Sequence, residues 1–336
     1  MTLRIGLLGA SRIAPQAILT PAATMDDVVV TRVAASSPAR AEQFAAEHGI
    51  ADVERDYAAL LRSDQVDLVY NALPPHAHLE LTLAAVSAGK AVLCEKPFAM
   101  NAAQAVRMVH AGQSASQPVI EAFHYRFHPL MDRTLELLRS DTIGRPTQLE
   151  AHFNVPIPYR AGELRHTLEL GGGALMDLGC YPVHWVRAVM GTEPRVHTAH
   201  AEQGQPGIDI SMHATLHFDG VPATVSCSMD TRLAPGISAR LHVMGTHGHL
   251  SIDNPIAPQS GHELRWQVRS GPTQTERVTG NSTYWHQLRH VKAVMDGTAS
   301  AITGGQDAIA NMAAIDAIYR AARMHPRGRT QELPAP

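Results

Sequence analysis

The chain of 336 residues is 45% hydrophobic and 18% charged, and its formal net charge is -3. This length indicates two domains. The near-neutral net charge gives no reason to expect nucleic acid or an anionic membrane as a partner. No apolar stretch approaches the ~20 residues of a membrane span, and the N-terminus lacks the pattern of a signal peptide. Three cysteines without disulfide or metal spacing are typical of a reducing cytoplasm, where we expect the protein to act.

The first 121 residues alternate between short apolar strands and helices. The predicted strands cover residues 3–9, 28–35, 66–72, 91–94 and 119–123, and the predicted helices cover 10–19, 38–47, 78–88 and 102–111. Strict alternation with short links predicts a parallel, doubly wound sheet of the Rossmann type. Because ligands bind at the carboxyl ends of such strands, we expect Gly9, Ser36, Leu73 and Glu95 to share one cleft.

After residue 122 the pattern changes. Residues 131–139 and 307–324 are predicted helices, and strands are predicted at 147–155, 209–218, 223–229, 239–244 and 263–268. Links such as Phe218–Asp219–Gly220 indicate hairpins. We therefore predict a dinucleotide-binding domain over 1–121 and an α+β domain over 122–336. The second domain has a large, mostly antiparallel sheet for substrate binding and oligomerisation, and its last helix is a candidate to pack back on the first domain.

The first strand ends in a variant of the dinucleotide-binding fingerprint. In register it reads G-x-S-x-x-A, with small residues at Gly9, Ser11 and Ala14 that let the backbone approach a pyrophosphate. The free amides at the start of the next helix favour phosphate oxygens. We expect Gly9, Ser11, Arg12 and Ile13 to bind the cofactor; the alternative is a plain strand-turn-helix.

The second strand ends without the acidic residue that usually holds the ribose hydroxyls of NAD. Ser36, Ser37 and Arg40 stand there instead and could receive the 2′-phosphate of NADP. This pattern favours NADP over NAD. The alternative is that Arg40 is one solvated charge at a helix start.

Two strings carry candidate chemistry. Cys94–Glu95–Lys96–Pro97 places a lysine after a buried strand, and Gly171 to Tyr181 places Asp177 and Tyr181 four residues apart behind three glycines. Burial and a positively charged nicotinamide would lower the pKa of a lysine toward the range useful for proton transfer. Four residues bring the carboxylate and phenol to one helical face, with Pro182 in the first turn or at a kink near Gly179.

Several other polar residues are candidates for substrate contact. Tyr125, Arg126 and His184 are the first set, and Arg160, Arg165 and His166 precede the glycines and could cap the cleft. His184 could equally be a satisfied core histidine. The 20 histidines show no metal-ligand pattern, so we expect no metal site.

Together these strings resemble the Gfo/Idh/MocA oxidoreductase family over nearly the whole chain. The resemblance is carried by residues 5–14, 72–78, 95–97, 121–129, 171–181 and 311–319. Within the family, the chain is most similar to the branch of dihydrodiol dehydrogenase, xylose dehydrogenase and sugar ketoreductases, which has tyrosine at position 181 where inositol dehydrogenase has histidine. We expect Leu73, Pro74, His78, Glu95 and Lys96 to complete the cofactor contacts.

The resemblance implies a dehydrogenase or reductase that transfers a hydride between the nicotinamide of NAD(P) and a secondary alcohol or ketone. The substrate would be a sugar, polyol or cyclic diol. Lys96 would be the essential residue, Tyr181 a second proton donor, and Asp177 a carboxylate that accepts from a hydroxyl or orients the lysine. Two alternatives stay open: a non-catalytic cofactor-binding sensor or scaffold, and an NAD-assisted glycosidase. The expected assembly is a homodimer or homotetramer.

Overall fold

The computed structural model describes residues 1–233 and 236–328, which divide into two compact units. The first unit comprises Met1–Ala99, Ala103–His128 and Asn281–Ile309, and the second comprises Met100–Ala102, Pro129–Gly280 and Ala310–Pro336. Residues 281–309 thus belong to the compact unit of the N-terminal sheet, although they come late in the chain. The functional boundary expected at residue 121 stays a prediction.

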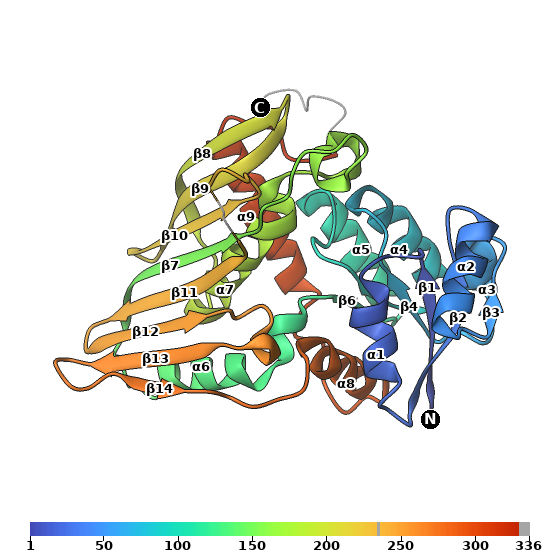
Figure 1. Cartoon of the computed structure of the whole chain (residues 1–336), viewed down its shortest axis with the longest axis horizontal. Coiled ribbons are helices and arrows are strands. Elements are labelled where there is room, and N and C mark those ends of the chain that lie inside the picture. The colour runs from blue at the N-terminus through green and yellow to red at the C-terminus, as the bar shows by residue number, and fades with distance from the viewer. Residues whose placement is uncertain (234–235, 329–336) are drawn as a thin grey trace. The chain divides into compact units, whose positions relative to one another are not determined.

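The first unit is built on a six-stranded parallel sheet (Figure 1). Its strands are β1 (Leu3–Leu8), β2 (Val28–Ala34), β3 (Asp52–Val53), β4 (Leu68–Asn71), β5 (Ala91–Cys94) and β6 (Val119–Glu121). The spatial order β3-β2-β1-β4-β5-β6 reverses between β1 and β4, the arrangement in which doubly wound sheets bind ligands. The predicted Rossmann-type sheet is therefore confirmed. The prediction lacked β3, because two residues are too few to show a period.

The first unit also contains six α-helices among its described residues. They are α1 (Thr20–Ala22), α2 (Pro38–His48), α3 (Tyr57–Arg62), α4 (His78–Ser87), α5 (Ala102–Ser114) and α8 (Thr283–Met295). The sequence pattern predicted neither α3 nor α8. Tyr284, Leu288 and Val291 of α8 recur at helical spacing and enter the same apolar core as Leu3 and Ile5 of β1. A helix from late in the chain therefore completes the core of the N-terminal sheet.

The second unit is built on an eight-stranded sheet (Figure 1). Its strands are β7 (Pro146–Asn154), β8 (Arg195–Gln205), β9 (Ile208–Phe218), β10 (Val221–Ser228), β11 (Ser238–Gly245), β12 (Gly248–Asp253), β13 (Glu263–Val268) and β14 (Gln274–Glu276), in the spatial order β14-β13-β12-β11-β7-β10-β9-β8. Its neighbouring strands are antiparallel except β7 and β10, which confirms the predicted sheet. Asp219 and Gly220 both have positive φ in the two-residue link between β9 and β10, as a tight hairpin requires.

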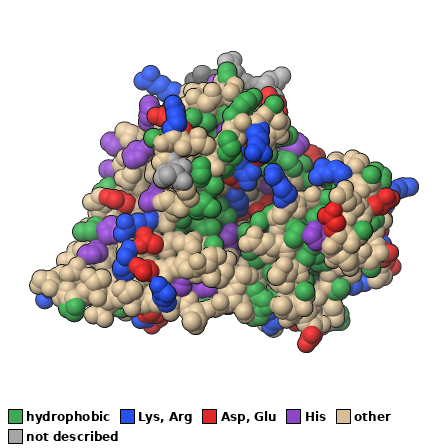
Figure 2. All heavy atoms as spheres, viewed as in Figure 1, with side chains coloured by type: hydrophobic (Ala, Val, Ile, Leu, Met, Phe, Trp, Pro, Cys, Tyr) green, Lys and Arg blue, Asp and Glu red, His purple; other side chains and the backbone are tan. Residues whose placement is uncertain are grey.

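The two faces of this sheet differ in polarity. Leu149, Ala151 and Phe153 of β7 are buried, whereas Glu150 and His152 alternate with them along the strand. Figure 2 shows charged and histidine side chains interspersed over the area that the sheet occupies in Figure 1.

The α-helices of the second unit are α6 (Pro129–Arg139), α7 (Cys180–Met190) and α9 (Gln306–Ala321). The first residues of α9, up to Ile309, belong to the first unit.

Within residues 1–233 and 236–328, no helix is both long and apolar enough to cross a membrane.

Candidate functional site

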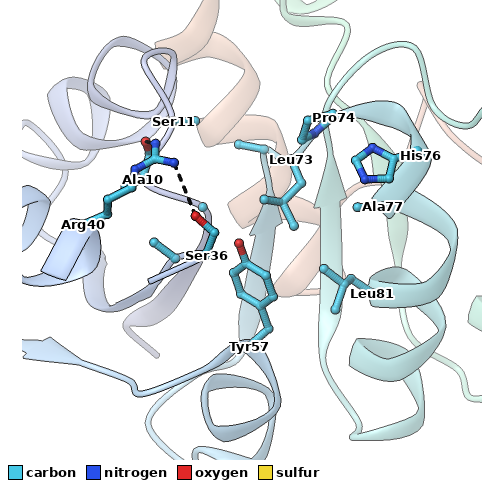
Figure 3. Close-up of a pocket in the computed structure, with 13 residues that line it drawn as sticks. Ala10, Ser11, Ser36, Arg40, Tyr57, Leu73, Pro74, His76, Ala77 and Leu81 are labelled. Atoms are coloured by element: carbon cyan, nitrogen blue, oxygen red, sulfur yellow. Dashed lines mark hydrogen bonds between the residues drawn. The ribbon is translucent and has the colours of Figure 1, made fainter. Parts of the chain in front are cut away.

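A pocket of about 430 Å³ lies in the first unit, where β1, β2 and β4 end (Figure 3). Its lining residues are Gly9, Ala10, Ser11, Ala35, Ser36, Arg40, Tyr57, Ala72, Leu73, Pro74, His76, Ala77 and Leu81. The pocket therefore stands at the strand ends on either side of the point where the order of the sheet reverses. Of the predicted cofactor residues, it brings together Gly9, Ser11, Ser36, Arg40, Leu73 and Pro74.

Gly9 shows why the loop after β1 needs glycine. Its φ is +99°, in the region that L residues rarely adopt, and a Cβ atom there would lie 3.0 Å from the Leu73 side chain. Ser11 then accepts the Ala14 N–H at 3.3 Å, so its hydroxyl caps the start of the following helical turn. The backbone can thus approach a bound phosphate closely, beside the amides of a helix start.

Arg40 places a positive charge on the wall of this pocket. Its guanidinium donates to the Ser36 hydroxyl at 3.3 Å and to the Ala10 carbonyl at 3.4 Å, as Figure 3 shows for Ser36. Both bonds are long, so the cation is held at the rim rather than consumed by a strong ion pair. Tyr57 stands across the space; burial raises the pKa of its phenol, and the positive charge of Arg40 acts against that.

The predicted cofactor residues did not include the other seven lining residues of the pocket, namely Ala10, Ala35, Tyr57, Ala72, His76, Ala77 and Leu81. A local signal was present for Tyr57. Asp56 accepts the Ala59 N–H at 2.6 Å and begins the short helix α3 with Tyr57 as its first residue. An aspartate before an apolar run is a recognised helix start, so α3 could have been predicted from that signal.

The remaining predicted cofactor residues lie outside the pocket lining. Ser37 caps α2 by accepting the Arg40 N–H at 3.4 Å, which assigns its hydroxyl to the helix. Arg12 is exposed, and Ile13 packs against the apolar core. His78 is fully buried: its Nε2 lies 2.7 Å from the Leu73 carbonyl oxygen, and its Nδ1 lies 3.2 Å from that of Phe98. The imidazole therefore connects the pocket loop to the loop that carries Lys96.

Lys96 comes two residues after the end of β5, and hydrogen bonds hold the residues near it in place. The Glu95 carboxylate accepts from the Tyr70 hydroxyl at 2.5 Å, and the Phe98 N–H donates to the buried carboxylate of Glu121 at 2.9 Å. The peptide bond between Lys96 and Pro97 is cis. These contacts fix the loop on both sides of the lysine.

His124 lies in the helical turn after β6 and is buried without charge. Its Nδ1 is 2.7 Å from the Thr283 hydroxyl, and its ring packs on Tyr284 with ring centroids 4.1 Å apart. Burial lowers the pKa of His124 to about 3, and the charge of Lys96 adds to the shift. The imidazole therefore stays neutral in the folded protein throughout the physiological range.

This shift predicts acid sensitivity. Because the folded-state pKa lies below the unfolded value of about 6.5, the stabilisation is present above pH 6.5 and is lost as the pH falls toward 3. We expect His124 to cost about 2 kcal/mol of unfolding free energy between pH 6.5 and 4.5. Urea titrations at several pH values measure this, with His124→Asn losing the steep acid dependence and exposed His110→Asn keeping it. Equal slopes in wild type and His124→Asn would contradict the assignment.

Asp177 and Tyr181 lie on one continuous helical segment in the second unit. Residues Leu175–Gly179 form a π-helical turn that leads into α7 at Cys180. Pro182 has no N–H to donate to the preceding turn, and a widened turn upstream is one way to accommodate it. Tyr181 is 4% exposed and meets Phe153 edge to face, with ring centroids 5.5 Å apart. Pro182 is the third residue of α7, so of the two expected positions the structure shows the first turn, with the π turn directly before it.

Asp177 is paired with a residue from the segment before the glycines. Its Oδ2 accepts from Arg165 Nε at 2.6 Å, and Arg165 Nη1 donates to Glu163 at 2.9 Å. Tyr159, by contrast, is exposed on the same segment and packs its ring against His166. The structure therefore assigns a definite partner to Arg165, which the sequence had left as one of several basic candidates.

A buried cluster that sequence reasoning missed supports the start of this helical segment. Asp209 accepts from Arg327 at 2.5 Å, from the Tyr319 hydroxyl at 2.9 Å and from the Leu175 N–H at 2.7 Å. Arg327 also donates to the Gly172 carbonyl at 2.7 Å. A local signal for this cluster was absent, because Asp209 lies 110 residues before Tyr319 and 118 before Arg327.

The predicted substrate residues occupy different settings. Tyr125 is 1% exposed in the turn after β6, with Arg126 half-buried beside it in the first unit. His184 is buried in α7 of the second unit. In the parts of the chain that the structure describes, no three His, Cys, Asp or Glu side chains form a group that could hold a metal.

Comparison with known proteins identifies relatives along the chain. Residues 3–123 match the profile of an oxidoreductase family with an NAD-binding Rossmann fold, and residues 131–251 match the GFO/IDH/MocA C-terminal domain. D-xylose 1-dehydrogenase (NADP(+)) 2 of Haloferax volcanii is 31% identical over 321 residues, which cover 94% of this chain and 96% of that protein. Trans-1,2-dihydrobenzene-1,2-diol dehydrogenase of Xenopus tropicalis is 32% identical over 274 residues, covering 79% and 81% respectively.

A solved structure shows the same architecture. The 3-ketoreductase from Actinomadura kijaniata, in complex with NADP and TDP-benzene, matches with a TM-score of 0.87 and 25% sequence identity. The match covers 96% of this chain and 98% of the ketoreductase chain. The likeness therefore concerns both units rather than the nucleotide-binding half alone.

Proposed function

Since the chain belongs to the Gfo/Idh/MocA family of NAD(P)-dependent oxidoreductases, we propose that Lys96 and Tyr181 move the proton that accompanies hydride transfer at a secondary alcohol or ketone. The substrate is a sugar, polyol or cyclic diol, in keeping with relatives named for xylose and for a dihydrobenzene diol. The observation that carries the proposal is the place of Lys96, at the end of β5 in the sheet whose neighbouring strand ends line the nucleotide-sized pocket.

The pocket fits a dinucleotide that carries a 2′-phosphate. Gly9 lets the backbone approach the pyrophosphate, and Ser36 and Arg40 offer a hydroxyl and a cation where an NAD site usually has a carboxylate. NADP is therefore the favoured cofactor, and NAD the second choice. When bound, the nicotinamide accepts or returns the hydride. The chain's own residues supply binding, orientation and proton transfer.

Lysine suits this proton transfer because it can lose its charge, whereas arginine stays protonated. Three of the 28 basic residues are lysines, namely Lys90, Lys96 and Lys292. Lys90 donates to the carbonyls of Ser63 and Val66 at 2.7 Å each, and Lys292 pairs with Asp296. In the proposal Lys96 exchanges the proton of the reacting oxygen, Tyr181 donates a hydrogen bond to the same oxygen, and Asp177 accepts from a neighbouring hydroxyl.

The test is turnover of the purified protein with NADP and with NAD on a panel of aldoses, polyols and cyclic diols, and of NADPH and NADH on keto-sugars. The absorbance of the reduced nicotinamide reports both directions. Turnover on at least one hydroxyl or keto substrate is expected. Tight NADP binding without turnover across the panel would instead favour a sensor or scaffold and would overturn the proposed catalysis.

Arg40 predicts the cofactor preference. Replacing it with alanine removes a charge-assisted contact worth about 1.5–3 kcal/mol, so the Kd of NADPH should rise about 10- to 100-fold. The Kd of NADH should change little, because NADH lacks the 2′-phosphate. Fluorescence titration of both cofactors measures the ratio, and Arg62→Ala, an exposed arginine outside the pocket, serves as the matched control. A parallel loss for NADPH and NADH would contradict the assignment.

The setting and assembly of the protein complete the proposal. We propose that it works in the cytoplasm, in keeping with three buried free thiols, as a homodimer or homotetramer. The polar face of the eight-stranded sheet is the candidate subunit surface. Residues 1–121 are proposed to hold the cofactor, and residues 122–336 to supply substrate contacts, with Tyr125, Arg126 and His184 among them.

A further inference from the structure

We propose that Arg165 is a positioning residue for the reaction: it aims the Asp177 carboxylate and keeps it ionised so that Asp177 can accept a substrate hydroxyl. The inference rests on the proposed function and names an additional residue for it. It concerns contacts within the second unit alone.

The side chain of Arg165 joins two carboxylates. Its Nε donates to Asp177 Oδ2 at 2.6 Å and its Nη1 donates to Glu163 Oε1 at 2.9 Å. The side chains of Asp177 and Glu163 are 18% and 17% exposed, against 32% for Arg165. A charge-assisted bond of this length to a mostly buried carboxylate restricts both the direction and the charge of that carboxylate.

The backbone of the same residue rests on the glycine string. The Gly173 N–H donates to the Arg165 carbonyl at 3.0 Å, and the Gly172 N–H donates to the Thr167 carbonyl at 2.9 Å. A Cβ atom on Gly172 would lie 2.7 Å from the Arg165 carbonyl oxygen and 2.8 Å from that of Leu164. The second glycine therefore provides the space in which the Arg165 turn lies. A side chain at position 172 would collide with these carbonyl oxygens, which explains why the residue is glycine.

The charges around Asp177 are consistent with this role. The pKa of Arg165 is raised, with the negative charge of Asp177 as the largest cause. Glu163, which shares Arg165, and the thiols of Cys180 and Cys227 are among the other titratable groups near Asp177 in this unit. Burial raises the pKa of the Cys227 thiol, so that thiol stays neutral. Arg165 supplies a positive charge in direct contact with Asp177.

Loss of Arg165 would change the titration of Asp177. Without the positive charge of Arg165, a carboxyl group that is largely out of water binds a proton more readily. A protonated Asp177 loses an acceptor for a substrate hydroxyl. The protein should then lose activity at an acid pH at which the wild type is still active.

The test measures kcat/KM for ketone reduction against pH, in the first seconds after mixing with NADPH. In this direction Lys96 acts in its protonated form, so an acid limb reports the carboxylate rather than the lysine. R165Q should move that limb upward by about one pH unit or more and lower kcat/KM at pH 7 about 10- to 100-fold. R165K should return the acid limb to its wild-type position. R195Q, at an exposed position of β8, should match the wild type. The Kd of NADPH should be the same in all variants.

Two further variants sharpen the outcome. R165Q should cause no further loss in a D177N background, because the two side chains act as one unit. E163Q removes a negative charge that shares Arg165, so its acid limb should move to lower pH. If R165Q does not fold, the position of the acid limb in E163Q tests the proposal. An unmoved limb in R165Q or E163Q, or multiplying losses in the double variant, would overturn the proposal.

A readout without turnover separates this inference from the proposed function. In protein labelled with ¹³C at the aspartate carboxyl carbon, the resonance absent from D177N belongs to Asp177, and its titration reports the pKa directly. A rise of that pKa in R165Q supports the inference even if no substrate turns over, and an unchanged pKa rejects it. Absence of turnover in the wild type would reject the proposed function instead.

Discussion

Replacing Lys96 with alanine is expected to lower kcat by about 10³-fold or more while the Kd of NADPH changes by less than about tenfold. General acid–base catalysis contributes about 10²- to 10⁴-fold to rates, and a lysine at the reacting oxygen also orients the substrate. The fold should survive, because Glu95 and Phe98 fix the loop through hydrogen bonds of their own. Steady-state kinetics in both directions and fluorescence titration of NADPH measure the two quantities.

Lys90 offers the control for this experiment. It precedes β5 as Lys96 follows it, and it donates to two carbonyls in the same unit. Lys90→Ala should lower the unfolding free energy by about 1–3 kcal/mol, since it leaves those carbonyls without their partner, and should leave kcat near the wild-type value. Full activity of Lys96→Ala would refute the proposed chemistry, whereas a parallel collapse of NADPH binding would assign Lys96 to the fold.

Replacing Arg327 with methionine is expected to lower the unfolding free energy by about 3–5 kcal/mol. The side chains of Arg327 and Asp209 are 2% and 0% exposed. Removing one partner of such a pair leaves an uncompensated buried charge. Burial raises the pKa of Asp209, and the charge of Arg327 acts against that shift. Urea denaturation at neutral pH measures the loss, with exposed His325→Ala on the same segment expected to stay within about 0.5 kcal/mol of wild type.

A double variant separates the charge from the packing. Arg327→Met combined with Asp209→Leu should be less destabilised than Arg327→Met alone, because the apolar pair removes the orphaned carboxylate. Asp209 also accepts the Leu175 N–H and Arg327 donates to the Gly172 carbonyl, so the single variant should lower kcat as well as stability. Stability equal to wild type in Arg327→Met would show that the pair contributes little.

The same cluster explains the third glycine of the string. Gly173 has a φ of +134°, and a Cβ atom there would collide with Asp209 and would lie 2.6 Å from Arg327 Nη2 and 2.8 Å from the Tyr319 hydroxyl. The sequence placed Asp177 and Tyr181 behind three glycines but gave no reason for the absence of side chains there. The structure shows two close approaches, at Gly172 to the Arg165 turn and at Gly173 to a buried ion pair.

Local patterns predicted the parts of the fold whose causes are local. Strand-helix alternation, the small residues from Gly9 to Ala14 and the turn at Asp219–Gly220 each reflect contacts within a few residues, and the structure confirms the architecture that they predicted. Helix α8 escaped prediction because its polar residues obscure an apolar stripe that has meaning only against β1. Tyr57 escaped because a helix of six residues offers little periodicity.

By itself the sequence determined the doubly wound sheet, the antiparallel second sheet, the nucleotide-binding loop and the position of Lys96 after a buried strand. These depend on period, turn chemistry and chain order, all of which are written locally. The tertiary structure alone decided that Arg165 holds Asp177, that Arg327 neutralises Asp209 from 118 residues away, and that α8 completes the first core. Such contacts join segments that are far apart in the sequence and meet only after folding, so a local sequence pattern cannot predict them.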